Sequence, residues 1–232
     1  MRYPHLLTAL ALALLVCGCA KDPSKDAPKA QVGEPIGADK SASTTAPADA
    51  PQPAAAPAPK GPTARKVVDL TGTIGFVGSK VSGSHAGVFQ EWSGGMLMGE
   101  SLETARLSFE VQVASVFSDP ENRTPWSEKL DKHLINEDFF HAEKFPTAAF
   151  TSKKILPGAE GDATHTITGD LTMRGVTRPV TFPATVSLTD VEVKAKAEFT
   201  INRKEWGIEY KGKPDDLIRD GVVLKIDLTG VR

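Results

Sequence analysis

The chain has 232 residues but only two cysteines, Cys17 and Cys19, and both lie near the N-terminus. The rest of the chain therefore has no cysteine pair for a disulfide and must rely on a packed core, for which it is long enough. An excess of positive charge is also missing, because 27 Lys and Arg residues oppose 29 Asp and Glu residues and give a formal net charge of −2. This balance leaves no basic surface of the kind that binds nucleic acid, so we exclude nucleic acid as a partner.

The sequence also lacks the motifs that are typical of many enzymes and metal sites. There is no HExxH metal motif, no GxSxG nucleophile elbow, no phosphate-binding P-loop and no GxGxxG dinucleotide fingerprint. His85, His133, His141 and His165 do not show the close spacing of metal ligands. We therefore predict no enzyme activity, no metal and no cofactor. A metal-dependent enzyme stays a weaker alternative, which would need two or more of these histidines to meet in the fold.

Long apolar runs are missing, apart from one near the N-terminus. Arg2 precedes an almost unbroken apolar run from Leu6 to Val16, which is too short to span a bilayer comfortably but suits a secretion signal. The four residues 16–19 (VCGC) resemble a bacterial lipobox with Cys19 as the acylated residue. We predict a lipoprotein signal peptide over residues 1–19. The alternative is ordinary cleavage near Ala20, which would release a soluble periplasmic protein.

A lipid-modified Cys19 would carry enough acyl chains for stable anchoring to a membrane. The predicted location is therefore the periplasmic side of a bacterial membrane. Ala20 stands after Cys19 where an Asp would favour the inner membrane, so the outer membrane is favoured over the inner.

Residues 20–65 are rich in Ala, Pro, Lys and Asp and nearly free of large apolar side chains. Such a segment cannot bury enough apolar surface to offset its ordering entropy, so we predict a disordered linker. Its predicted role is to hold a folded domain away from the membrane, at roughly 40 Å if it behaves as a coil.

From residue 66 onward, apolar and polar residues alternate over several segments. The cleanest is 105–114, and residues 191–201 and 222–228 repeat the pattern. Residues 169–180 predict two strands joined by a tight turn at Arg174-Gly175, where Gly175 supplies a positive φ. Pro179 cannot donate to a strand ladder, so it belongs at a sheet edge or a bulge.

We predict an all-β fold for residues 66–232, an antiparallel barrel of roughly eight strands, because closure removes exposed strand edges. One short helical segment is expected after Thr124, which can cap a helix that has Pro125 at its first position. The interior of such a barrel is either filled by side chains or open to one small ligand, and alternation alone does not decide between the two.

Three stretches resemble motifs of the YceI-like family. They are residues 169–180 (GDLTMRGVTRPV), residues 133–150 (HLINEDFFHAEKFPTAAF) and residues 201–208 (INRKEWGI). The resemblance extends from about Val67 to the C-terminus and implies a lipocalin-like barrel. It also implies that the barrel holds a polyisoprenoid or a similar long amphiphilic lipid in an apolar cavity.

For such a ligand, the candidate cavity residues are inward-facing apolar positions of the predicted strands. They are Ile74, Phe76, Leu107, Phe109, Val111, Val113, Phe150, Leu171, Val180, Phe182, Val186, Phe199, Leu224 and Ile226. Arg174, Arg178 and Arg203 are candidates for a charged head group by charge alone, with solvated surface positions as the alternative.

The predicted function is thus binding or carriage of an amphiphilic lipid, without a further cofactor, by a protein that a lipid anchor attaches to the membrane. A homodimer is compatible with this prediction. The alternative from another class is a tethered structural or interaction module whose barrel is filled by its own side chains. The volume of the barrel cavity distinguishes the two.

Overall fold

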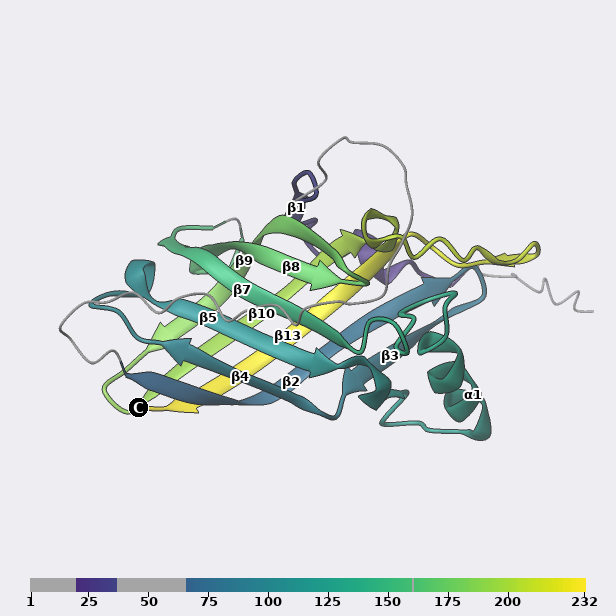
Figure 1. Ribbon diagram of the computed structural model, residues 1–232. Coiled ribbons are helices and arrows are strands. Elements are labelled where there is room, and N and C mark those ends of the chain that lie inside the picture. The colour runs from purple at the N-terminus through teal and green to yellow at the C-terminus, as the bar shows by residue number, and fades with distance from the viewer. Residues whose placement is uncertain (1–19, 37–65, 160) are drawn as a thin grey trace, which may run out of the picture.

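Eight strands of the computed structural model form a closed antiparallel barrel (Figure 1). The structure describes residues 20–36, 66–159 and 161–232. The barrel order is β13-β10-β9-β8-β7-β5-β4-β2, and β13 pairs with β2 to close it. The strands are β2 (Val67–Lys80), β4 (Trp92–Leu97), β5 (Arg106–Gln112), β7 (Thr147–Pro157), β8 (His165–Met173), β9 (Val176–Leu188), β10 (Glu192–Asn202) and β13 (Gly221–Val231). The predicted fold class is confirmed.

Alternation of side chains produces the barrel strands. In β5 every second residue is buried and the others are exposed, as the period of two in residues 105–114 predicts. The hairpin of β8 and β9 is also confirmed. Arg174 and Gly175 form its turn, with φ values of 51° and 72°.

Shorter elements extend or cover the barrel. β2 pairs with β4 only at its start, and β3 (Gly83–Phe89) takes over along its second half, followed by β6 (Val116–Ser118). The small hairpin of β11 (Gly212–Lys213) and β12 (Asp216–Leu217) projects from one end (Figure 1). Three short 3-10 turns, η2 (Leu102–Thr104), η3 (Val113–Ser115) and η4 (Arg203–Trp206), connect strands.

The only α-helix among the described residues is α1 (Pro125–Leu134), at the same end of the barrel as the β11–β12 hairpin (Figure 1). Thr124 Oγ1 accepts a hydrogen bond from the backbone N–H of Trp126, and Pro125 occupies the first turn, so the predicted start is confirmed.

The prediction of a disordered linker is wrong for its first part. Residues 20–36 contain a 3-10 turn, η1 (Pro23–Lys25), and a short strand, β1 (Gln31–Val32), which pairs with β9. Composition missed this because backbone hydrogen bonds to the barrel hold the segment, and these do not require large apolar side chains. The signal peptide, Cys19 and residues 37–65 lie outside the described residues, so those predictions stay untested.

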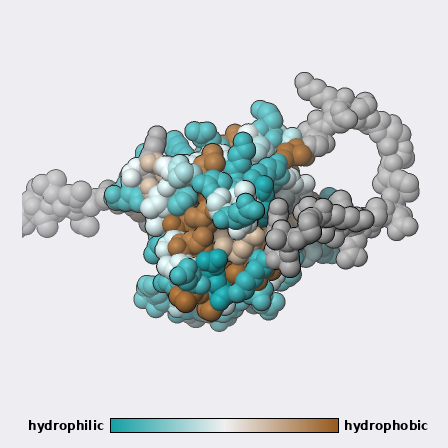
Figure 2. Space-filling model, turned by 90° about the vertical axis from the view of Figure 1, so that its left-hand side faces the viewer, coloured by the Kyte–Doolittle hydropathy of each residue, from teal (hydrophilic) through white to brown (hydrophobic). Residues whose placement is uncertain are grey.

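The end of the barrel opposite α1 is closed by side chains. Val68, Met96, Ile155, Ile167 and Leu228 are each buried to at least 98% in this half. Figure 2 looks onto this end and shows apolar residues among hydrophilic ones. Val67, Val191 and Val231, from the start of β2, the β9–β10 turn and the end of β13, are 60–79% exposed.

Gly72 allows β2 to approach β13 closely, and we predict that replacing it destabilises the protein. Its φ is +130°, and a Cβ atom there would lie 2.0 Å from the backbone oxygen of Asp227. Gly72→Ala should therefore lower the free energy of unfolding by about 2–4 kcal/mol. Gly78→Ala, in the same strand, is the matched control, because its Cβ would meet no atom within 4 Å. Urea denaturation measures both, and equal stability of the two variants would contradict the prediction.

Candidate functional site

The half of the barrel nearer α1 contains a cavity. Its volume is about 140 Å³, counted as the space open to the centre of a water molecule. One water needs about 10–15 Å³ by this measure, so the space corresponds to roughly ten waters. Apolar side chains from β2, β5, β7, β8, β9, β10 and β13 form nearly all of the wall. The interior of the barrel is therefore filled by side chains in one half and contains a cavity in the other.

Four phenylalanines separate the filled half from the cavity, and we call them the aromatic floor. Phe109, Phe150, Phe182 and Phe199 stand on β5, β7, β9 and β10 and all line the cavity. Successive ring centroids are 5.5, 5.6 and 4.0 Å apart, and the last pair is stacked with an angle of 10° between the ring planes. Such contacts fix the rings in place and leave the space above them unfilled.

The segment after α1 covers the cavity from the other side. Phe140 packs against Phe76 and Phe89, with centroids 6.5 and 5.8 Å apart. Phe139 contacts the rings of His133 and Tyr210 at 4.9 and 5.5 Å. Both Phe139 and Phe140 line the cavity, so this pair of adjacent aromatic residues closes the cavity at the α1 end of the barrel.

Most of the predicted cavity residues lie where the sequence placed them. Ile74, Phe76, Phe109, Val111, Phe150, Leu171, Val180, Phe182, Phe199, Leu224 and Ile226 line the cavity. Leu107 and Val186 do not, because they lie below the aromatic floor in the filled half, and Val113 starts η3 beyond the end of β5. The alternation identified inward positions but not their height along the barrel axis. Contact of any of them with a ligand stays a prediction.

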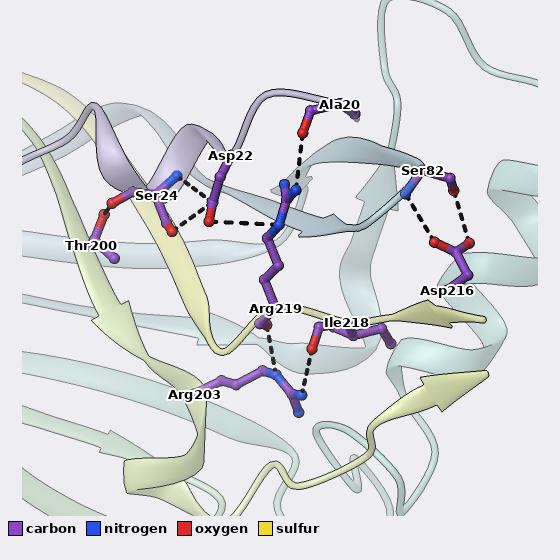
Figure 3. Close-up of polar contacts among 9 residues, drawn as sticks. All are labelled: Ala20, Asp22, Ser24, Ser82, Thr200, Arg203, Asp216, Ile218 and Arg219. Atoms are coloured by element: carbon purple, nitrogen blue, oxygen red, sulfur yellow. Dashed lines mark hydrogen bonds and ion pairs between the residues drawn. The ribbon is translucent and has the colours of Figure 1, made fainter. Parts of the chain in front are cut away.

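Arg203 lies at the polar end of the cavity. Its side chain is only 4% exposed, and it donates to the backbone oxygens of Arg219 and Ile218 at 3.1 and 3.4 Å (Figure 3). It also donates to the backbone oxygen of Ile208 at 2.6 Å. Burial lowers the pKa of the Arg203 guanidinium, while the charges of Asp220 and Glu209 oppose this shift. The three backbone bonds show that Arg203 first of all organises the loop around it.

Arg219 also lines the cavity, and the sequence analysis missed it. Its Nη2 atom donates to the backbone oxygen of Ala20 at 2.9 Å, and its Nε atom lies 3.6 Å from Oδ2 of Asp22 (Figure 3). Its Nη1 atom is buried and has no hydrogen-bond partner among the described residues. The sequence shows that Arg219 stands just before the last strand, which is where a residue at the barrel end could be expected. Nothing in the sequence indicates that residues 20–22 lie beside it.

The other two predicted head-group residues do not line the cavity. Arg174 donates to the backbone oxygens of Glu137, at 2.8 Å, and of Phe139. Arg178 donates to the backbone oxygens of Gly33 and Glu205 at 2.9 and 2.7 Å. Both guanidinium groups therefore hold loops in place, and their assignment to a head group is not supported by their positions.

A second, more open cleft adjoins the cavity, and we call it the vestibule. Its volume is about 370 Å³, and it shares Arg203, Ile218 and Arg219 with the cavity. Its other lining residues are Val81, Lys204, Lys211, Leu217 and Asp220. Four cationic side chains thus surround this cleft with one carboxylate, which favours an anionic or hydrogen-bond-accepting group there.

Neither a candidate metal site nor a membrane-spanning helix is found in the described ranges. No group of three or more His, Cys, Asp and Glu side chains there could hold a metal ion. His85 and His133 pair with Asp119 and Asp138 at 2.9 and 3.0 Å, respectively. No helix in the same ranges is long and apolar enough to cross a membrane. Absence of catalysis stays a prediction.

Asp216 fixes the β11–β12 hairpin, which forms one wall of the vestibule. Its carboxylate accepts hydrogen bonds from Lys80 Nζ and from the backbone N–H and Oγ of Ser82, the latter two at 2.9 and 2.8 Å. These bonds, that of Lys80 first, lower the pKa of Asp216 from 3.8 to about 2.

We expect this shift to make the hairpin sensitive to acid. Because the folded pKa lies below the unfolded one, the contribution of Asp216 to stability is complete above pH 3.8 and is lost as the pH falls through about 2. An NMR titration of the Asp216 carboxyl carbon should give a value near 2, and Lys80→Met should raise it. Lys225→Met, which removes a charge paired with Glu198 on the barrel wall, should leave it unchanged. A normal Asp216 pKa in the unmodified protein would refute the anchoring role.

Comparison with known proteins assigns the chain to a family. The model of the YceI-like domain matches residues 66–230. UPF0312 proteins of Pseudomonas fluorescens and Pseudomonas putida are each 30% identical over 178 residues, which cover 71% of this chain and 85% of theirs.

Two solved structures share the fold. Burkholderia cenocepacia BcnA gives a TM-score of 0.57 at 23% identity, covering 68% of this chain and 94% of that one. A polyisoprenoid binding domain from Saccharophagus degradans gives 0.52 at 13% identity, covering 72% and 98%. At these identities the two structures support the fold alone. The family model and the Pseudomonas relatives go further, and the chain belongs to the YceI-like family.

Proposed function

We propose that this protein binds a polyisoprenoid or a similar long amphiphilic lipid in its barrel. The observation that carries the proposal is the apolar cavity above the aromatic floor, which shares Arg203, Ile218 and Arg219 with the cation-lined vestibule. An apolar space with a polar end suits a molecule that has a long apolar tail and a polar head. The polyisoprenoid binding domain from Saccharophagus degradans, which shares the fold, supports the same ligand class.

The tail accounts for the affinity in this proposal. Each buried CH₂ group contributes about 0.8 kcal/mol, so a few isoprene units above the aromatic floor bind without any polar contact. The tail lies between Phe150 and Phe76, and the remaining chain extends toward the vestibule.

The head group lies at the Arg203 and Arg219 end in this proposal. Arg203 has its backbone partners, whereas Nη1 of Arg219 has none among the described residues and can donate to a ligand oxygen. A buried donor without a partner is costly, so a ligand that accepts from it gains affinity.

We place the protein on the periplasmic side of a bacterial membrane, attached through a lipid on Cys19. The apolar run and the VCGC sequence before residue 20 support this location. The alternative function, an interaction module with a filled barrel, is less well supported, because only one half of the interior is filled.

Native mass spectrometry of the full chain, purified in mild detergent from a bacterial host, tests the ligand class first. A stoichiometric adduct with isoprenoid mass spacing is the expected result. Protein that is free of lipid and also fails to take up added undecaprenol would refute the proposal.

A bulky residue inside the cavity should weaken binding. Ala148 lines the cavity and is paired with Val111, whose side chain lies on the same inner face. Ala148→Phe should lower the affinity for fluorescently labelled geranylgeraniol about tenfold, because it displaces at least two CH₂ groups. Thr185→Phe, on the exposed face of β9, adds the same ring outside the barrel and is the control. A fluorescence titration in which both variants bind alike would contradict the assigned cavity.

A further inference from the structure

The ladder between β9 and β10 covers only part of these strands. Its pairs run from Val193–Leu188 to Lys196–Thr185 and stop there, although both strands continue toward the cavity end. We call the unpaired part the seam. The β2–β4 ladder is also partial, but there β3 continues the pairing along β2, whereas no barrel strand among the described residues continues the ladder on β9 beyond Thr185 toward β10.

Two prolines explain why the ladder stops. The backbone oxygens of Thr177 and Pro179 accept hydrogen bonds from the N–H groups of Ile36 and Gly33, respectively. The odd-numbered residues of β9 therefore direct their backbone N–H and C=O groups toward the seam. By the same alternation Pro183 faces the seam, one step beyond Thr185. Neither proline has an N–H group, so β10 cannot continue the ladder at these two positions.

The N-terminal segment 20–36 occupies the seam, and we call it the strap. The N–H and the C=O groups of Thr200 on β10 bond to Pro28 O and Ala30 N, at 2.8 and 2.9 Å. On the other side Gln31 and Val32 pair with Thr181 and Val180 of β9. The strap thus lies as an additional strand between β9 and β10, beside cavity residues from both.

The strap is held mainly by polar contacts. Arg178 and Arg219 donate to the backbone oxygens of Gly33 and Ala20, and Thr200 Oγ1 donates to Ser24 O at 3.0 Å. Its apolar contribution is small: Ala27 is buried, Ala30 and Val32 pack against the core, and Ile36 is 51% exposed. Each such hydrogen bond adds only about 0.5–1.5 kcal/mol net, so the strap can detach at much lower cost than the barrel unfolds.

We propose that the strap is a lateral gate of the lipid cavity. When it detaches, the wall opens between Val180 on β9 and Ile201 on β10, which both line the cavity, and a lipid tail enters sideways between the strands. The stacked pair Phe182 and Phe199 marks the lower limit of this opening, because the β9–β10 ladder begins just below it. This inference rests on the proposed lipid-binding function.

A disulfide that locks the strap tests the gate. Gln31 and Thr181 are directly opposed across β1 and β9, so Gln31→Cys with Thr181→Cys places two cysteines within bridging distance. The full chain also carries Cys17→Ser and Cys19→Ser to avoid other pairings. Stopped-flow fluorescence with labelled geranylgeraniol should show uptake slowed at least about tenfold in the oxidised protein, because the open population is removed. A reductant should restore the rate.

Lys196→Cys with Asp227→Cys provides the matched control. This pair is directly opposed on the exposed face of β10 and β13, across the edge of β10 that does not face the strap, so its oxidation should leave the rate unchanged. In the opposite direction, Ala30→Pro removes the N–H that bonds to Thr200 O and should accelerate uptake about threefold.

The outcomes distinguish a failure of the proposed gate from a failure of the proposed lipid-binding function. If the locked and reduced proteins reach the same occupancy at the same rate, or if the control pair slows uptake equally, the gate is overturned and lipid binding stands. If the unmodified protein binds no labelled geranylgeraniol at equilibrium, the proposed function fails and the gate fails with it.

Discussion

The pairing of β13 with β2 is the contact on which the rest of the structure depends. It joins the last strand to the first strand of the barrel over a register that runs from Val223–Val77 to Gly230–Leu70. Without it the inward-facing side chains would line an open sheet, and neither an aromatic floor nor an enclosed cavity would exist. A contact between strands so distant in sequence carries a large loop-closure cost, and the close approach at Gly72 makes it geometrically possible.

Closure also determines what could be predicted from sequence. Period-two alternation and the turn at Gly175 were sufficient for the barrel, since each depends on a few neighbouring residues. The division into a filled and an open half was not predictable, because it depends on which rings meet across β5, β7, β9 and β10. Leu107 and Phe109 have the same pattern in sequence, yet only Phe109 lies at the height of the cavity.

Long-range polar contacts were the other limit. The sequence marks Arg174, Arg178 and Arg203 as cations, but their bonds to distant backbone oxygens come only with the fold. The docking of residues 20–36 was missed for the same reason. One local signal was available: Pro179 indicated a sheet edge, and Pro183 lies on the same side of β9. Two prolines at this spacing show that a neighbouring strand cannot pair there, and so that another segment must cover the gap.

Docking of residues 20–36 also has a consequence for how the strap returns to the barrel. Ile36 donates to the backbone oxygen of Thr177 on β9, and Met98, just after β4, donates to the backbone oxygen of Lys66, so Ile36 and Lys66 are both attached to the same barrel. A strap that detaches in the proposed gate is still joined through the chain to Lys66, so its return is an intramolecular step whose rate does not depend on protein concentration.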